Sequence, residues 1–292
     1  MRLKLLYNPA AGRGRARRRV EEIERYLRSR GSQLDVHAST SPADLTRAAA
    51  DGSRADYDRV VVCGGDGTIH FAVRDFDLER GVMAIIPLGS GDDFAQVAGI
   101  PRNLHAACDV VLDGKLREVD VATANGIRYL GVAGLGFDSE VAAFANRVKF
   151  LGGSLVYLYS IFRVLPRFTP RRVRVGTREE EIMFAVVGNS RQYGGGIRIV
   201  PAAQIDDGIL DLCMVHRTSR FQLLITLPLA YTGAHVRKSF VETGRGREFR
   251  FESDQPLDVY ADGEFVTTTP VTFGLEKRKL RVAAHFSAPT AC

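Results

Sequence analysis

The sequence predicts an N-terminal α/β domain of Rossmann-like type followed by a β-rich domain, and three observations lead to this fold class. Up to about residue 121, short apolar strands alternate with helical segments, as in a parallel sheet covered by helices. Two of those strands end in glycine-rich turns, as at the ligand-binding edge of such sheets. From Val121 onward the strands are shorter and are separated by turn residues. A chain of 292 residues is comfortable for two domains, which we place at residues 1–121 and 122–292, with the last residues free to pack back on the first domain.

The first domain is expected to alternate strands and helices. Strands are predicted at residues 3–7, 33–38, 57–63 and 82–86. After the first strand, Val20, Ile23 and Leu27 recur at intervals that are typical of one face of a helix. Pro42, which follows a hydroxyl residue, is typical of a second helix start, and residues 104–112 predict another helix.

The second domain is predicted mainly from short β-type segments. Strands are expected at residues 129–133, 172–175, 182–188, 210–216, 249–252, 257–261, 271–275 and 280–284. Helices are expected at residues 139–144 and within residues 150–162. A further apolar stretch, residues 221–234, is predicted to be interrupted by Pro228.

The composition indicates a folded protein with anionic partners. Hydrophobic residues make up 45% of the chain, which supports real cores. The net charge of +6 favours nucleotides, anionic lipid surfaces or nucleic acid. Nucleic acid is the weakest of these, and we expect none, because the arginines lack interleaved aromatic residues. The four cysteines show neither paired nor metal-ligand spacing, which fits a reducing cytoplasm.

No segment predicts a signal peptide or a membrane span. The apolar start gives way to Asn8 and Pro9 too early for a signal peptide. The longest uncharged run, residues 150–162, is shorter than the ~20 residues that a spanning helix needs. Basic residues bracket this run, so it either rests in a membrane interface or, the interpretation we favour, packs against its own domain. We therefore expect a cytoplasmic protein that is at most peripheral on the inner face of the membrane.

The rest of the chain is organised around the strand and turn at residues 60–69. The β-branched residues 60–62 are typical of a strand covered on both faces. The glycines that follow leave no Cβ between backbone N–H groups and a phosphate, and the next helix directs its positive end at the same anion. Asp66 within an anion cradle requires a cation, which we take to be magnesium. The alternative is a tight turn in which Asp66 only caps its helix.

A second glycine-rich turn, residues 87–95, follows the strand at residues 82–86 and carries Ser90 and Asp93. Ligands bind at the carboxyl ends of strands in such sheets, so we expect both turns to gather at one edge. Other nucleotide signatures are absent: there is no G-x-x-x-x-G-K-[ST], no H-R-D loop and no zinc spacing. The acids Asp66, Asp93 and Asp262 are therefore left to do the chemistry.

These motifs resemble the diacylglycerol kinase catalytic domain family in its bacterial lipid kinase form. Residues 64–68 resemble its G-G-D-G-T signature, which NAD kinases and, more distantly, phosphofructokinases share. The other resemblances are residues 8–12 to N-P-x-[SA]-G, 87–95 to P-x-G-T-x-N-D-F-A, 134–138 to G-x-G-[FL]-D, 188–208 to a bacterial lipid kinase block, and 262–264 to a late D-G-E. NAD kinases lack that C-terminal series.

The resemblance implies an ATP-binding N-terminal domain and a C-terminal β-sandwich that takes the lipid. The implied ATP contacts are Asn8, Pro9, Ala10, Ala11, Gly12, Thr40, Gly64, Gly65, Asp66, Gly67, Thr68, Ile69, His70 and Ser90. Asp66 and Asp93 would join an aspartate–water–magnesium network, and Glu264 would accept the proton, with Asp262 in its immediate network. A structural magnesium ion would lie on the turn at Asp207 and use carbonyls near Gln204 and Ile209.

Two positions depart from the family pattern. Ser90 replaces the usual Thr and keeps the hydroxyl. Asp92 replaces the usual Asn, which adds a negative charge near the phosphates and removes an amide donor. We expect Asp92 to weaken ATP binding or to alter the metal requirement.

The sequence thus predicts an ATP- and magnesium-dependent lipid kinase that phosphorylates a hydroxyl of diacylglycerol or a related lipid. One alternative is a soluble small-molecule kinase of the NAD kinase type. Another is a nucleotide-binding regulator without turnover. Diacylglycerol, a sphingoid base, phosphatidylglycerol and a polyisoprenoid alcohol all stay open as acceptors, and a homodimer stays open as the assembly.

Overall fold

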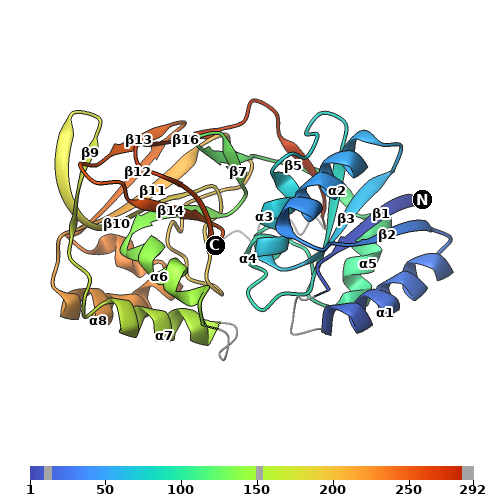
Figure 1. The fold of residues 1–292 in the computed structure, drawn as a ribbon, viewed down its shortest axis with the longest axis horizontal. Coiled ribbons are helices and arrows are strands. Elements are labelled where there is room, and N and C mark those ends of the chain that lie inside the picture. The colour runs from blue at the N-terminus through green and yellow to red at the C-terminus, as the bar shows by residue number, and fades with distance from the viewer. Residues whose placement is uncertain (10–14, 149–153, 285–292) are drawn as a thin grey trace. The chain divides into compact units, whose positions relative to one another are not determined.

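The structure, a computed structural model, describes residues 1–9, 15–148 and 154–284 (Figure 1). The chain divides into two compact units. The first consists of Met1–Val119 and of the segment that begins at Lys277, and the second is Asp120–Glu276. The first unit is an α/β structure and the second is β-rich, as the sequence predicts.

A six-stranded sheet with the order β2-β1-β3-β4-β17-β5 forms the centre of the first unit. Its strands are β1 (Arg2–Tyr7), β2 (Gln33–Ala38), β3 (Arg59–Gly64), β4 (Val82–Pro87), β5 (Lys115–Val119) and β17 (Leu280–Ala284). All pairs are parallel except β17 with β5. Leu5, Val61 and Ala84 lie in register on three adjacent strands and are fully buried, as expected for strands covered on both faces.

The strand at residues 280–284, predicted among the segments of the second domain, is β17 and lies between β4 and β5 of the first sheet. Its parallel pairing with β4 joins Arg281 to Val82 and Val282 to Met83. The end of the chain therefore completes the sheet that its beginning started.

Five helices accompany this sheet in the described residues: α1 (Arg15–Ser29), α2 (Pro42–Arg54), α3 (Asp66–Val73), α4 (Asp93–Val97) and α5 (Leu104–Asp113). Val20, Ile23 and Leu27, the predicted apolar face of α1, are buried in one core with the sheet and α5. The second helix begins at Pro42 as predicted, and the Ser41 hydroxyl caps it by accepting the backbone N–H of Asp44 at 3.1 Å.

The second unit contains an eleven-stranded sheet. Its strands are β6 (Ala122–Ala124), β7 (Ile127–Tyr129), β8 (Val132–Gly136), β9 (Arg171–Val175), β10 (Arg178–Gly188), β11 (Leu210–His216), β12 (Val241–Gly246), β13 (Phe249–Glu252), β14 (Asp258–Ala261), β15 (Glu264–Thr268) and β16 (Val271–Leu275). The order is β15-β14-β8-β10-β9-β13-β16-β6-β7, and β11 pairs with both β10 and β12. Every pair in this sheet is antiparallel.

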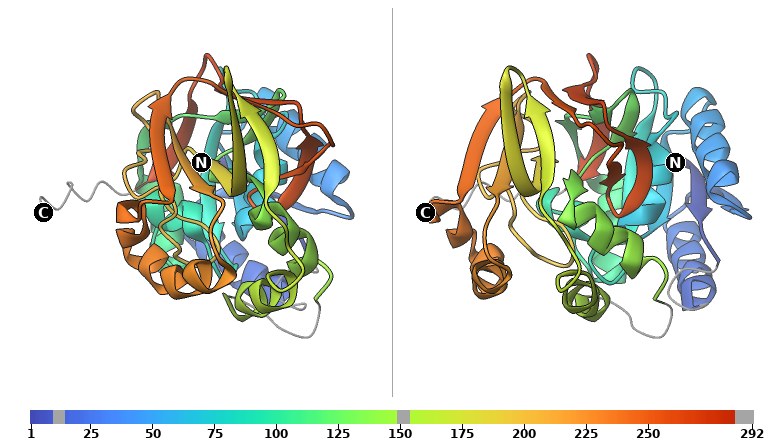
Figure 2. Two further views of the ribbon diagram at one scale, coloured as in Figure 1. Left: turned by 90° about the vertical axis from the view of Figure 1, so that its left-hand side faces the viewer. Right: turned by 60° about the vertical axis from the view of Figure 1, so that its left-hand side comes forward.

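Strand β10 separates two hydrophobic cores of this unit. Ala185 and Val187 belong to one core, whereas Phe184 and Val186 belong to the other. Successive residues of a strand point to opposite faces, so both faces of β10 are covered. The second core also contains residues of α6 (Phe137–Ala145), α7 (Ser154–Val164) and α8 (Arg220–Thr232), which lie on the same side of the strands (Figures 1 and 2).

The prediction that Pro228 interrupts its apolar stretch is wrong, because α8 continues through it. A proline removes one backbone hydrogen bond of a helix, and here the helix is held at both ends. Ser219 and Gln222 form a capping box at its start, and Gly233 ends it in the left-handed region with φ of 79°. Within the residues that the structure describes, no helix combines the length and the apolar character needed to cross a bilayer.

Candidate functional site

The two glycine-rich turns of the first unit pack backbone to backbone. They follow the adjacent parallel strands β3 and β4, and the N–H of Leu88 donates to the carbonyl of Gly64 at 3.0 Å. A Cβ on Gly89 would lie 2.6 Å from the Cα of Gly65, so a side chain there would force the turns apart. The predicted gathering of these two turns is therefore present in the structure.

The carboxylate of Asp66 links the two turns. Asp66 is the first residue of α3, and its Oδ2 and Oδ1 accept the backbone N–H groups of Asp93 and Phe94 at 3.2 and 3.1 Å. It thus caps the start of α4, rather than only its own helix as the alternative prediction had it. A carboxylate offers about four lone-pair positions, so these two hydrogen bonds do not by themselves exclude a magnesium contact. The predicted magnesium contact of Asp66 is therefore compatible with these hydrogen bonds, and the N–H of Asp93 helps to orient the carboxylate.

Asp92, the departure from the family pattern, is buried inside the second turn. It has a φ of 51°, in the left-handed region that Asn and Asp tolerate better than most residues. Its Oδ1 accepts the N–H of Gly89 at 2.9 Å, and its Oδ2 lies 3.9 Å from Nε of Arg102. Burial raises the pKa of the Asp92 carboxyl. The added charge thus lies near Arg102 and also borders a polar cavity, and the expectation that it weakens ATP binding stays a prediction.

A polar cavity of about 280 Å³ adjoins this turn. Its lining residues are Ala16, Arg19, Pro87, Leu88, Gly89, Ser90, Asp92 and Arg102. Ser90 and Arg19 are exposed, and the guanidinium of Arg102 donates to the carbonyls of Ser90 and Gly91. Two arginines, a hydroxyl and a glycine backbone are suited to an anionic ligand such as a phosphate, whereas the Asp92 carboxylate in the same lining opposes one.

The remaining predicted ATP contacts are distributed unevenly. Asn8 and Pro9 follow β1, whereas Ala10, Ala11 and Gly12 lie outside the described residues. The backbone N–H and the hydroxyl of Thr40 both donate to Oδ2 of Asp44, at 3.0 and 3.3 Å, so Thr40 helps to hold the start of α2.

Three of the side chains after Gly67 face inward. Thr68, Ile69 and His70 are buried, and His70 is fully so. Its Nε2 lies 2.9 Å from Nη2 of Arg74. The ATP contacts at these positions stay a prediction. Because these side chains are enclosed, such contacts would be made by backbone groups of the helix start.

Asp262 and Gly263 form the two-residue turn between β14 and β15, with φ of 52° and 86°. The Asp262 carboxylate accepts three backbone N–H groups at 3.0–3.2 Å, those of Leu130, Gly131 and Val132. Asp262 thus fixes the loop that leads into β8, which is a structural role beside the predicted one. Glu264 follows as the first, half-buried residue of β15.

The structural magnesium site predicted at Gln204, Asp207 and Ile209 stays a prediction, and its carboxylate has a cationic neighbour in the structure. The Asp207 carboxylate is paired with the guanidinium of Arg245, which also lies 3.2 Å from Asp211. Ile209 turns its N–H toward Oδ1 of Asp207, at 3.1 Å. In the part of the chain that the structure describes, no group of three or more His, Cys, Asp or Glu side chains is arranged to hold a metal ion.

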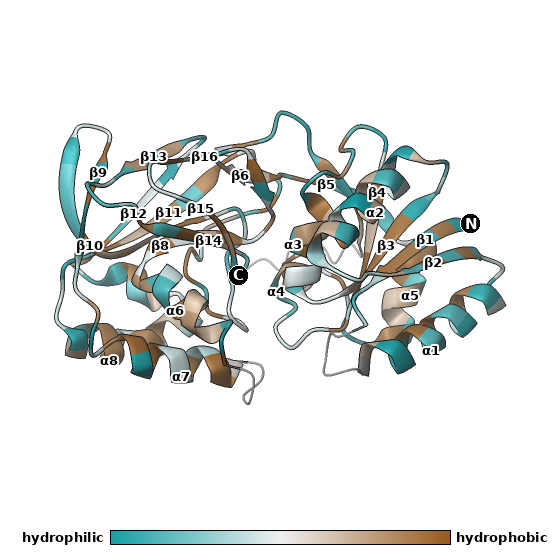
Figure 3. Ribbon diagram, viewed as in Figure 1, coloured by the Kyte–Doolittle hydropathy of each residue, from teal (hydrophilic) through white to brown (hydrophobic). Residues whose placement is uncertain are grey.

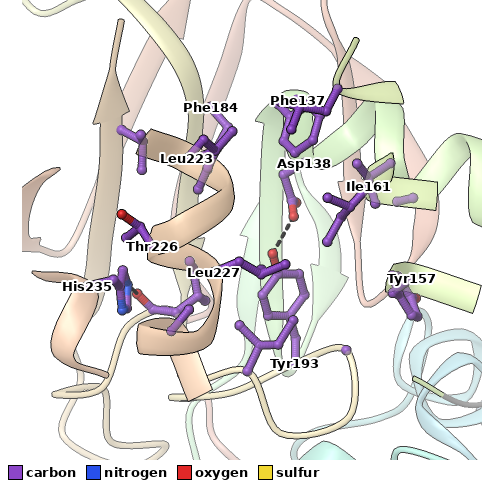
Figure 4. A pocket seen from close by; sticks show the side chains of 18 of the residues that line it. Phe137, Asp138, Tyr157, Ile161, Phe184, Tyr193, Leu223, Thr226, Leu227 and His235 are labelled. Carbon is purple, nitrogen blue, oxygen red and sulfur yellow. Dashed lines mark hydrogen bonds between the residues drawn. The ribbon is translucent and has the colours of Figure 1, made fainter. Parts of the chain in front are cut away.

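An apolar cavity of about 100 Å³ lies in the second unit, among α6, α7, α8 and the sheet (Figure 4). Its wall includes Phe137, Ile161, Phe184, Leu223 and Leu227. Among these side chains, the Tyr193 hydroxyl donates a hydrogen bond to Asp138, and the close-up shows the pair facing the cavity. An acid and a phenol within an apolar wall can orient the polar end of an otherwise apolar ligand.

Asp138 ends the G-x-G-[FL]-D motif in the sequence, but its place at the cavity was not predicted from that motif. Burial raises the pKa of its carboxyl to about 6, against the opposing effect of the hydrogen bond from Tyr193. The neighbouring strand is adapted to it, since a Cβ on Gly134 would lie 2.1 Å from Oδ2 of Asp138. The signal was present in the sequence: an acid that directly follows a buried glycine-rich strand end at residues 134–137.

Comparison with known proteins supports the family resemblance seen in the sequence, over most of the chain. Residues 2–124 match the diacylglycerol kinase catalytic domain, and residues 131–284 match the YegS C-terminal NAD kinase beta sandwich-like domain. A diacylglycerol kinase of Mycobacterium tuberculosis is 34% identical over 288 residues, which cover 95% of this chain and 93% of the relative. A diacylglycerol kinase of Bacillus subtilis is 26% identical over 280 residues, which cover 93% of this chain and 92% of the relative.

A solved structure agrees with these matches. A Bacillus anthracis protein assigned to the diacylglycerol kinases superposes with a TM-score of 0.82 at 25% identity, over 97% of this chain and 95% of its own. The predicted fold class, including the sandwich-like C-terminal domain, and the predicted family are thereby confirmed. The chain belongs to the diacylglycerol kinase family of lipid kinases.

Proposed function

We propose that this protein transfers the γ-phosphoryl group of MgATP to a hydroxyl of diacylglycerol or of a related lipid alcohol. The observation that carries the proposal is the combination, in one chain, of a glycine-turn anion site and an apolar cavity that contains an acid–phenol pair. A phosphate donor suits the first and a lipid suits the second. A small polar acceptor such as NAD would leave the apolar wall without a purpose, which favours the lipid kinase over a kinase of the NAD type.

The chemistry would rest on positioning and charge, as in other phosphoryl transfers. Backbone N–H groups of the two turns and the start of α3 would hold the phosphates. Asp66 and Asp93 would bind the magnesium ion that accompanies ATP. The lipid oxygen would form its bond to the γ-phosphorus as the bond to the β-phosphate oxygen breaks, with ADP as the leaving group. Glu264 would take the hydroxyl proton, and Asp262 would hold the turn that precedes Glu264.

Because its acceptor is a membrane lipid, we propose that the protein works on the inner face of the cytoplasmic membrane.

The regulator alternative remains distinguishable, since a regulator would bind ATP without consuming it. A homodimer would be detected by sedimentation of the purified protein.

A panel assay tests this function. Purified protein is supplied with labelled ATP, magnesium and, in separate reactions, diacylglycerol, a sphingoid base, phosphatidylglycerol, a polyisoprenoid alcohol or NAD. We expect label in one or more lipids and none in NAD. Label in NAD alone would instead identify a small-molecule kinase, and ATP binding without acceptor-dependent turnover would identify a regulator. Asp56, an exposed carboxylate of the first unit, provides a matched control (Asp56→Asn) for substitutions of Asp66.

A further inference from the structure

The peptide unit between Gly263 and Glu264 connects the β14–β15 turn to the proposed proton acceptor. The side chain of Asn146, 117 positions before Gly263, donates from Nδ2 to the carbonyl of Gly263 at 2.8 Å. Because a peptide unit is planar, a bond that fixes this carbonyl also fixes the direction in which the backbone enters Glu264. Asn146 therefore acts on the backbone group that adjoins Glu264.

Helix α6 places Asn146 at this turn. Asn146 is the C-cap residue of the helix, and its backbone N–H donates to the carbonyl of Ala142 at 3.0 Å. Its backbone is thus fixed by the last turn of the helix, while its side chain reaches Gly263. Asn146 is exposed, so its hydrogen bond competes with water and contributes little to the net stability of the protein. A bond of this kind is better suited to positioning than to stabilisation.

A second asparagine, Asn189, holds the same turn from the interior. It directly follows β10 and is fully buried. Its Nδ2 donates to the carbonyls of Asp120 and Leu130 at 2.9 and 3.0 Å. Its backbone N–H donates to the carbonyl of Gly131 at 2.9 Å. Asn189 thus binds the carbonyls of residues 130 and 131, whereas Asp262 binds the N–H groups of the same two residues.

The loop at residues 130–132 links Asn189 to Asp262 with little room to adjust. A Cβ on Gly131 would lie 2.5 Å from Oδ1 of Asp262. The backbone N–H of Asp262 in turn donates to the carbonyl of Val132 at 3.0 Å, so the loop and the turn bind each other in both directions. The strands β8, β10 and β14, which pair here, are largely hydrophobic, and a buried amide among them needs these partners (Figure 3). A shift of Asn189 would therefore move the turn.

We propose that Asn146 and Asn189 are positioning residues, which hold Glu264 where it takes the proton of the lipid hydroxyl. The inference rests on the proposed function. Asn146 acts through the carbonyl of Gly263, and Asn189 acts through the loop that Asp262 binds. Proton transfer depends on such positioning, because a displacement of about 1 Å can cost about 10²-fold in rate. A purely structural role would instead lower activity only as far as it lowers the folded fraction.

Steady-state kinetics of diacylglycerol phosphorylation separate these two roles. Asn146→Ala removes the bond to Gly263, so we expect kcat to fall about tenfold, while KM for ATP stays within about twofold of wild type. The melting temperature should stay within about 2 °C, because the residue is exposed. Asn146→Gln should restore most of the lost kcat, since it keeps an amide donor and the exposed position leaves room for the longer side chain.

Asn125 provides a matched control in the same unit. It is exposed, and its Nδ2 donates to the carbonyl of Pro270 at 3.0 Å. Asn125→Asp removes this donor and keeps a residue type that tolerates the φ of 50° at this position. We expect the control to keep the kcat of wild type. Wild-type kcat in Asn146→Ala as well would overturn the positioning role of Asn146.

A double-mutant cycle tests whether Asn146 acts through Glu264. Glu264→Asp withdraws the carboxylate by one methylene group and should by itself lower kcat by about tenfold or more. In that background the position is already lost, so we expect Asn146→Ala to lower kcat by less than about twofold further. An equal loss in both backgrounds would show that Asn146 acts independently of Glu264 and would overturn the proposal.

Asn189→Ala tests the buried side of the turn. It removes both amide bonds, so we expect a lower melting temperature and, at temperatures where the variant is fully folded, a kcat about tenfold below wild type. Asn189→Ser, which keeps one donor, is the milder variant for the same comparison if Asn189→Ala does not fold. A folded variant with the kcat of wild type would overturn the role of Asn189.

Failure of the proposed function has a different signature. A wild type that phosphorylates no lipid would overturn the proposed function, and the positioning role with it. A wild type that phosphorylates lipid, together with full kcat in Glu264→Asp, would leave the proposed function in place and overturn the positioning role, because the proton acceptor would then be another group.

Discussion

Asp66 and Asp93 are joined by a hydrogen bond in which the Asp66 carboxylate accepts the backbone N–H of Asp93 at 3.2 Å. Two acids that lie 27 positions apart in the chain are thereby fixed at adjacent strand ends. The bond explains how two turns that each contain glycine can hold a defined geometry: the side chain of one turn caps the helix of the other. Asp66 consequently has both a structural task and a proposed catalytic one.

Substitution of Asp66 separates these two tasks. Asp66→Asn keeps an oxygen acceptor for the start of α4 but loses the charge, so we expect lipid phosphorylation to fall by about 10²-fold or more with little change in thermal unfolding. Asp66→Ala should also lower the stability, by about 1 kcal/mol, through loss of the cap. Turnover and melting temperature are measured on both, beside Asp56→Asn. Near-normal turnover in Asp66→Asn would rule out a magnesium role for this carboxylate.

Substitutions of Asp262 and Glu264 should have opposite effects: the first should lower stability and the second should lower turnover. Asp262→Ala removes the acceptor of three backbone N–H groups, so we expect a loss of about 1–3 kcal/mol in the free energy of unfolding. Glu264→Gln should leave the denaturant midpoint in place and abolish measurable turnover, because an amide cannot accept the proton. Chemical denaturation and lipid phosphorylation are compared for the two variants. If Glu264→Gln kept its activity, the proton acceptor would have to be another group.

Asp92 gives a pH-dependent stability prediction. Burial raises its pKa above the ordinary value of 3.8, so its contribution to stability is full at pH values below 3.8 and is lost as the pH rises through the higher folded-state value. Asp92→Asn removes this loss while keeping an acceptor for the Gly89 N–H and a residue type that tolerates positive φ. We expect the variant to melt at a higher temperature than wild type at about pH 7.5, and the difference to shrink toward about pH 4. An advantage that stays constant with pH would show that Asp92 is not the group responsible.

Asp138 should make the stability of the protein depend on pH near its raised pKa. Its pKa of about 6 lies above the ordinary 3.8, so its contribution to stability is present below 3.8 and is lost as the pH rises through about 6. Tyr193→Phe removes the hydrogen bond that lowers this pKa, so we expect the loss to move to higher pH. Melting temperatures across this range, for wild type, Tyr193→Phe and Asp138→Asn, provide the measurement. The Asn variant should show no step near pH 6; a step of unchanged size in that variant would assign the titration to another group.

The strands, helix start and glycine turns of the first unit were predicted well, because short stretches of sequence determine them. Apolar runs with β-branched residues became β3 and β4, the hydroxyl before Pro42 marked the start of α2, and glycine turns at adjacent strand ends met as parallel-sheet geometry requires. Asp-Gly at residues 262–263 forms a tight hairpin turn, as the φ preferences of these residue types favour.

Other features depend on contacts that no local pattern contains. Strand β12 (Val241–Gly246) includes two glycines and an arginine and forms because β11 offers it an edge. The pairing of Asp207 with Arg245, 38 residues away in sequence, is another such contact. The cavity around Asp138 is assembled from three helices and a sheet, so its lining could not be read from spacing.

The place of β17 in the first sheet has a consequence for biosynthesis. Residues Met1–Val119 leave the ribosome first, yet the edge of β4 stays without its partner until Leu280–Ala284 has been made. The second unit has its two ends joined already, since the N–H of Glu276 donates to the carbonyl of Val121 at 2.8 Å. The second unit can therefore fold as one contiguous segment before the first unit has all of its strands. We expect the inserted unit to complete its folding during translation before the unit that precedes it.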